Sequence, residues 1–94
     1  MYEYDVEIVD RGLEPLTRGQ AVRLVEEGGE VLVRTFDGRQ PVASVRVEQQ
    51  HDGTYVLWGD GEGEEVETAE KAINLAVVCC EIVTDQYWAS EDDA

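Results

Sequence analysis

The stretch that decides the fold runs from residue 30 to residue 59 and reads EVLVRTFDGRQPVASVRVEQQHDGTYVLWG. Residues 30–36 and 42–50 are rich in valine, and apolar residues recur at every second position at Val31 and Val33 and again at Val45 and Val47, as in strands that bury one face. Turn signals follow each run, first Asp37–Gly38 and then His-Asp-Gly at 51–53, and a third apolar run spans 54–59. Residues 30–59 therefore predict three antiparallel strands joined by tight turns.

Helical patterns flank these strands on both sides. At 16–29, Thr17 can cap a helix, Gln20 stands where a capping box needs it, and Gly28 or Gly29 ends the pattern. A longer helical pattern covers 68–88, with Thr68 as its cap and apolar residues at helical spacing. The β-branched run 77–83 is compatible with a strand, but the polar stripe opposite the apolar face favours the helix.

The first residues alternate apolar and acidic side chains over 2–8, which predicts a strand. A chain of 94 residues has room for one core. The predicted fold is therefore α+β in the order β-α-β-β-β-α, with an antiparallel sheet of about four strands and two helices packed on one face. We expect a single domain over 1–88 and a flexible acidic tail over 89–94.

The charge of the chain is far from balanced. Seven basic residues face 22 acidic ones, the formal net charge is -15, and Lys71 is the only lysine. Three interpretations exist: adaptation to molar salt, mimicry of a nucleic acid, or an ordinary acidic protein. The scarcity of lysine favours the first, and the composition resembles that of haloarchaeal cytoplasmic proteins. The N-terminus carries no targeting signal and no apolar run is long enough to span a bilayer, so we expect a cytoplasmic protein without a membrane partner.

An acidic, glycine-rich segment, GDGEGEEVET at 59–68, is a candidate metal site. Asp60, Glu62 and Glu64 alternate like the start of a calcium loop. The sixth and twelfth loop positions, however, hold Glu65 and Lys71 instead of the required Gly and Glu. A solvated connector is therefore favoured, and a small metal-binding protein or enzyme that uses residues 60–65 is an alternative.

Residues for catalysis are few. His51 is the only histidine and lies in a predicted turn, while Cys79 and Cys80 are adjacent and fit two small buried residues. Neither a catalytic triad nor a zinc-binding spacing is present. An enzymatic role is therefore disfavoured, and the sequence predicts no catalytic residue and no cofactor.

From Gln20 onward, the order helix, three strands, helix resembles the topology of a double-stranded-RNA-binding domain, with a glycine-rich turn before the last helix. Lysines at the start of that helix grip phosphate in the family, whereas Glu65, Glu67, Thr68 and Glu70 stand there in this chain. Carboxylates would repel phosphate. We therefore expect no direct binding of nucleic acid.

Apolar residues on predicted surfaces are the best lead to a function. If Val31 and Val33 face the helices, Leu32 and Phe36 lie on the open face of the sheet, and Tyr55 and Leu57 join them if the alternation continues. A slip of one residue would invert this assignment. The predicted partner-binding residues are Leu32, Phe36, Tyr55, Leu57, Val78 and Ile82.

The composition and the apolar surface residues together predict a small, non-catalytic interaction or regulatory module from a halophilic cytoplasm. It would bind a protein partner, or itself as a homodimer, through an apolar patch. An acidic nucleic-acid mimic that blocks a basic DNA- or RNA-binding partner is the first alternative, and the metal-binding loop is the second.

Overall fold

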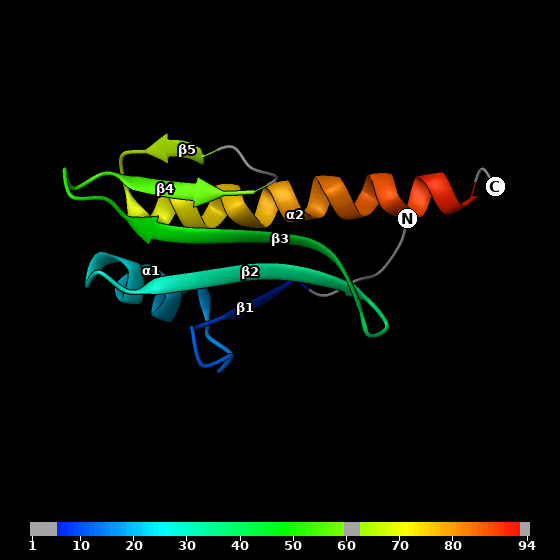
Figure 1. Cartoon of the computed structure of the whole chain (residues 1–94), viewed down its shortest axis with the longest axis horizontal. Coiled ribbons are helices and arrows are strands. Elements are labelled where there is room, and N and C mark those ends of the chain that lie inside the picture. Colours follow the sequence, from blue (N-terminus) through cyan, green and yellow to red (C-terminus); the bar gives the residue numbers. More distant parts are fainter. Residues whose placement is uncertain (1–5, 60–62, 93–94) are drawn as a thin grey trace.

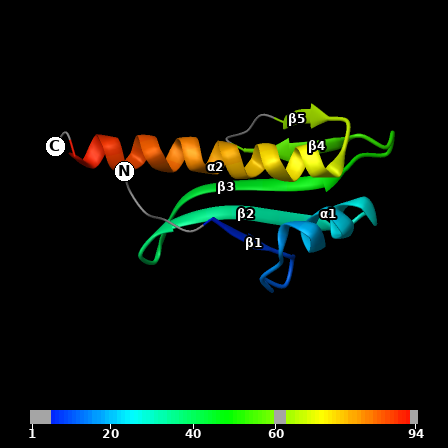
Figure 2. The ribbon, with the colours of Figure 1, turned by 180° about the vertical axis from the view of Figure 1, so that it is seen from behind.

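The computed structural model describes residues 6–59 and 63–92, with side chains up to residue 89. Its elements are β1 (Glu7–Val9), α1 (Arg18–Glu26), β2 (Glu30–Asp37), β3 (Gln40–Gln49), β4 (Tyr55–Trp58), β5 (Gly63–Val66) and α2 (Ala69–Asp92). The strands form one antiparallel sheet in the order β1-β2-β3-β4-β5 (Figure 1). Both helices pack on the same face of this sheet (Figure 2), which confirms the predicted α+β fold.

Helix α1 begins and ends as its sequence predicts. The Thr17 hydroxyl accepts a hydrogen bond from the Gln20 amide at 3.1 Å, and the Gln20 side chain accepts one from the Thr17 amide at 2.9 Å. This reciprocal pair is a complete capping box. Beyond the last turn, Gly28 adopts a positive φ of 92°, a conformation that glycine reaches without strain. The helix turns Ala21 and Val25 into the core.

Helix α2 is the longest element, about 36 Å at 1.5 Å per residue. The Thr68 hydroxyl caps it by accepting from the Lys71 amide at 3.2 Å. The face that it buries includes Ala72, Ile73, Ala76 and Cys80, so the strand alternative over 77–83 is wrong. The helix continues to Asp92, so residues 89–92, assigned above to the tail, are helical; residues 93–94 lie outside the described residues.

The sheet has five strands where the sequence predicts about four. Strand β5 lies within the segment 59–68, for which the sequence favours a solvated connector, and it pairs Val66 with Tyr55 and Gly63 with Trp58. Glutamate and glycine have low strand propensity, so the sequence of β5 gives no strand signal. The strand forms because β4 offers it a free edge, and its exposed glutamates then protect the new edge from further pairing.

The predicted first strand is described only from residue 6, and β1 itself covers three residues. Ile8 pairs with Val33 and points into the core beneath the helices. Val9 pairs with Leu32, on the opposite face, and is also buried. The predicted residues 2–5 lie outside the described part of the chain.

Candidate functional site

Helix α2 crosses the sheet obliquely. Its C-terminal half lies over β2, where the Cys80 thiol donates to the Val33 carbonyl at 3.4 Å and the Tyr87 hydroxyl donates to Asp37 at 2.8 Å. At its N-terminus the helix follows β5 after two residues, and it contacts β3, β4 and β5. Strand β4 pairs with β3 only from Arg46 to Gln49, so the first half of β3 has no described strand partner on that side. The helix face of the sheet is therefore left partly uncovered beside this half of β3.

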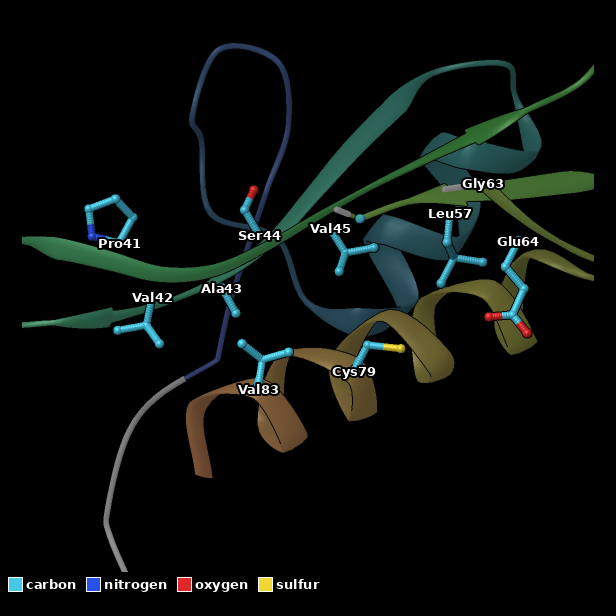
Figure 3. Close-up of a pocket in the computed structure, with 11 residues that line it drawn as sticks. Pro41, Val42, Ala43, Ser44, Val45, Leu57, Gly63, Glu64, Cys79 and Val83 are labelled. Carbon is cyan, nitrogen blue, oxygen red and sulfur yellow. The ribbon is translucent and has the colours of Figure 1, made fainter. Parts of the chain in front are cut away.

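A groove of about 660 Å³ occupies the uncovered corner. Val42, Ala43, Val45 and Leu57 form its floor on the sheet, while Cys79 and Val83 form a wall on α2 (Figure 3). The remaining lining residues are Pro41, Ser44, Gly59, Gly63 and Glu64. Glu64 is the one charged side chain among the described lining residues, so the groove suits apolar groups.

A β-bulge adds one side chain to this groove. Thr35 pairs with Ala43 but Phe36 pairs with Pro41, so Val42 is an extra residue in β3. Val42 and Ala43 consequently both point toward α2 (Figure 3). Bulges and prolines also hinder the addition of another strand, because the ladder is interrupted and Pro41 has no N–H to donate. A ligand is therefore expected to contact side chains in the groove rather than extend the sheet.

The outer surface of α2 continues the groove with further apolar side chains. Val78, Ile82 and Val83 are 47%, 52% and 39% exposed. Leu75 and Cys79 are half-buried between this surface and the core. The predicted residues Val78 and Ile82 are thus on the surface and lie next to the groove.

Leu32 and Phe36 lie on the opposite face of the sheet, as predicted, and both are half-buried. The Arg34 guanidinium sits 4.9 Å from the Phe36 ring centroid and forms two hydrogen bonds with Glu7, at 3.2 and 3.3 Å. Leu32 lines a small hollow beside Leu13. These two residues are separated from Val78 and Ile82 by the sheet, so the predicted set does not form one patch.

The placement of Tyr55 and Leu57 on the open face is wrong. Both are buried in the core beneath the helices, because Leu57 pairs with Val47, whose side chain faces the helices. Val56 and Trp58 take the open face instead. Every residue of β4 is apolar, so alternation could not specify its register. Leu57 still reaches the floor of the groove.

Asp60 and Glu62 of the candidate metal loop lie outside the described residues, and Glu64 is exposed in β5. Among residues 6–59 and 63–89, no cluster of three or more His, Cys, Asp or Glu side chains could hold a metal ion. His51 is exposed in the turn before β4. Burial raises the pKa of the Cys80 thiol to about 11, so this thiol stays protonated at neutral pH.

No match to the chain is found among protein-family models, curated proteins or solved structures. Within the described ranges, no helix is both long and apolar enough to cross a membrane. The groove is therefore interpreted from its own geometry and chemistry.

Sequence reasoning missed the groove because it missed the oblique path of α2 and the bulge. Helical spacing places Val83 on the apolar face of the predicted helix, and the sequence indicates no role for Val42. The signal for the bulge was weak: Gln40 and Pro41 directly follow the turn, where an edge proline is common.

Proposed function

We propose that this chain is a small, non-catalytic protein-interaction module of a salt-rich cytoplasm. It binds an apolar segment of a protein partner in the groove between β3 and α2. The observation that carries the proposal is the apolar lining of this groove, together with its continuation onto the exposed Val78, Ile82 and Val83.

The groove can supply useful but limited affinity. Burying one aliphatic side chain contributes roughly 1.5–3 kcal/mol before the costs of association are subtracted. A partner that inserts two or three such side chains between Val42 and Val83 would gain enough for a transient contact. That range suits an adaptor or regulatory module rather than a permanent complex.

The net charge of -15 favours apolar recognition if the protein works in molar salt. The Debye length there is about 3 Å, so attraction between exposed charges is largely screened, whereas apolar burial is not weakened by salt. The alternative of a nucleic-acid mimic requires carboxylates gathered on one face. The described carboxylates lie on both helices and on every strand except β4, so this distribution does not favour the alternative.

The test is affinity capture from the source cell at molar KCl with two variants. Val83→Asp places a charge in the wall of the groove, and Leu13→Asp places the same charge on an exposed leucine outside it. We expect the wild type and Leu13→Asp to capture the same protein and Val83→Asp to lose it, with all three folded by circular dichroism. Equal capture by Val83→Asp would exclude the groove as the binding site.

A further inference from the structure

The outer side of α2 carries an apolar stripe, most of which lies outside the lining of the groove. We define the α2 stripe as Leu75, Val78, Cys79 and Ile82. The spacing of Leu75, Val78 and Ile82 is three and then four residues, which is the spacing of a helix–helix seam. Val78 and Ile82 are about half exposed, and no charged residue interrupts the stripe. Within a chain of 22 acidic residues, the stripe itself is apolar, and the carboxylates of Glu81 and Asp85 border it on one side.

We infer that the α2 stripe binds a second copy of this chain. The two α2 helices pack antiparallel about a two-fold axis near Cys79, so that Val78 and Ile82 of each copy meet those of the other. This inference goes beyond the proposed function, because it assigns the outer side of α2 to a second copy of the chain. The stripe shares Val78, Cys79 and Ile82 with the binding surface proposed above, so a second copy and a bound partner segment would compete for these residues.

The distribution of charge along α2 favours a second copy and sets its direction. Lys71, the only lysine, lies one turn before Leu75 on the same side of the helix and has no ion pair among the described residues. The acids Glu81 and Asp85 lie in the other half of the helix. An antiparallel pair brings Lys71 of each copy toward the acidic half of its partner, whereas a parallel pair would oppose like charges. Antiparallel helix dipoles add to this preference.

The charge of the whole chain gives the association a distinctive salt dependence. Two copies that each carry -15 repel one another at long range. The screening length falls from about 10 Å at 0.1 M salt to about 3 Å at 1 M, and concentrated salt does not weaken apolar contacts. Self-association should therefore strengthen as KCl is raised. Binding of a basic protein to the same stripe would weaken instead, so the sign of the salt effect separates the two occupants.

Sedimentation equilibrium of the full chain at 0.2 M and 3 M KCl tests the inference. We expect a monomer–dimer equilibrium that shifts toward dimer at 3 M KCl. Ile82→Asp should weaken it at least about tenfold, because each interface would then bury two carboxylates. Leu13→Asp is the matched control, since Leu13 is 56% exposed against 52% for Ile82 and lies on the other face of the sheet. A wild-type monomer at millimolar concentration in 3 M KCl, or equal loss of dimer in both variants, would overturn the inference.

The adjacent cysteines locate the interface independently. Near the proposed axis the two Cys79 thiols face each other, whereas Cys80 is buried in the core of each copy. A short bismaleimide, which adds one thiol to each of its two double bonds, should join two wild-type chains and two Cys80→Ala chains. Cys79→Ser should abolish the cross-linked band. A cross-linked band that survives Cys79→Ser, or a dimer that resists cross-linking through Cys79, would exclude this interface. Both tests measure the chain alone and are independent of capture in the groove.

Discussion

At the scale of single residues, one hydroxyl pair fixes where α2 lies. Thr35 of β2 and Thr84 of α2 are both fully buried, and their hydroxyl oxygens are 2.5 Å apart. The Thr84 hydroxyl donates to the Cys80 carbonyl at 2.7 Å, so the Thr35 hydroxyl is the donor between the two. The pair holds the C-terminal half of α2 over β2, and that position opens the groove on the other side of the helix.

Removing half of this pair should destabilise the fold measurably. Thr84→Val leaves the Thr35 hydroxyl buried without its partner, which costs about 1–3 kcal/mol in the free energy of unfolding. The double variant Thr35→Val/Thr84→Val has no orphaned hydroxyl, so it should be less destabilised than the sum of the two single variants. Denaturant unfolding of the three variants measures this. Strict additivity would show that the two hydroxyls are not coupled.

The two cysteines should differ in reactivity. Because burial holds the pKa of Cys80 near 11, its thiol is neutral at pH 8, whereas Cys79 is half-buried at the edge of the groove. A thiol reagent should therefore label one cysteine quickly in the native chain and the second only after unfolding. Mass spectrometry of the labelled peptide identifies the site, and fast labelling of Cys80 in the native chain would contradict its burial.

The raised pKa of Cys80 also has a consequence for stability. The thiol of the unfolded chain ionises near its ordinary value of 9.0, while the folded chain keeps the proton to about 11. The folded state binds the extra proton between these values, so the stabilising effect is complete below pH 9 and is lost as the pH rises toward 11. The free energy of unfolding, measured over a series of pH values, should therefore fall less between pH 9 and pH 11 in Cys80→Ala than in the wild type.

At the scale of elements, the sequence predicted the helices and strands that short, local sequence patterns specify. The capping box of Thr17 and Gln20 locates α1, and the alternation of Val31, Val33, Val45 and Val47 indicates the buried faces of β2 and β3. Elements set by tertiary contacts could not be predicted. Strand β5 exists because β4 has a free edge, and the face of Leu57 is decided by its pairing with Val47. The groove depends on strand β5, on the face that Leu57 takes and on the path of α2. The sequence therefore indicated the exposed residues Val78 and Ile82 beside the groove, but not the residues of its floor.

The hairpin of β4 and β5 provides a test at this scale. A Cβ at Gly63 would lie 2.8 Å from Cζ3 of Trp58, whose indole N–H donates to Glu48 at 2.9 Å. Gly63→Ala should therefore displace the indole, lower stability by about 1–3 kcal/mol and red-shift the emission of Trp58. The emission is measured in a Trp88→Phe background, so that Trp58 is the only source of tryptophan fluorescence.

Gly59→Ala is the control for this hairpin, because no atom lies within 4 Å of the Cβ it would add. It should change neither stability nor emission by a comparable amount. If Gly63→Ala behaves like Gly59→Ala, the Trp58 indole does not pack against Gly63 as closely as the 2.8 Å distance requires.

At the scale of the whole molecule, a small core carries a large like charge. The described core is built mainly from valine and alanine, and the carboxylates surround it on nearly every element. The three described ion pairs all involve arginine: Arg11 and Arg46 with Glu30, and Arg34 with Glu7. Seven basic residues cannot pair with all 22 acidic ones, so dissolved ions must limit the mutual repulsion of the carboxylates.

This balance predicts a strong dependence of the melting temperature on salt. Between 0.1 M and 3 M KCl we expect the melting temperature to rise by at least about 10 °C, which corresponds to roughly 2 kcal/mol for a domain of this size. Replacing Glu64 and Glu65, both exposed in β5, by glutamine removes two charges and should reduce the rise. A melting temperature that is equal in both salts would show that the charge does not limit stability, and apolar contact would lose its advantage over charged contact.

The bulge at Val42 and the adjacent Pro41 have one more consequence. Salt that screens the carboxylates also removes the repulsion that normally keeps acidic chains from stacking into cross-β fibres. The open half of β3 would be the natural template for such stacking, yet a missing N–H and an interrupted ladder obstruct it by shape and hydrogen bonding. These obstacles do not depend on ionic strength. The bulge and the proline therefore oppose the pairing of β3 with other chains at any salt concentration, including the molar salt that screens the carboxylates.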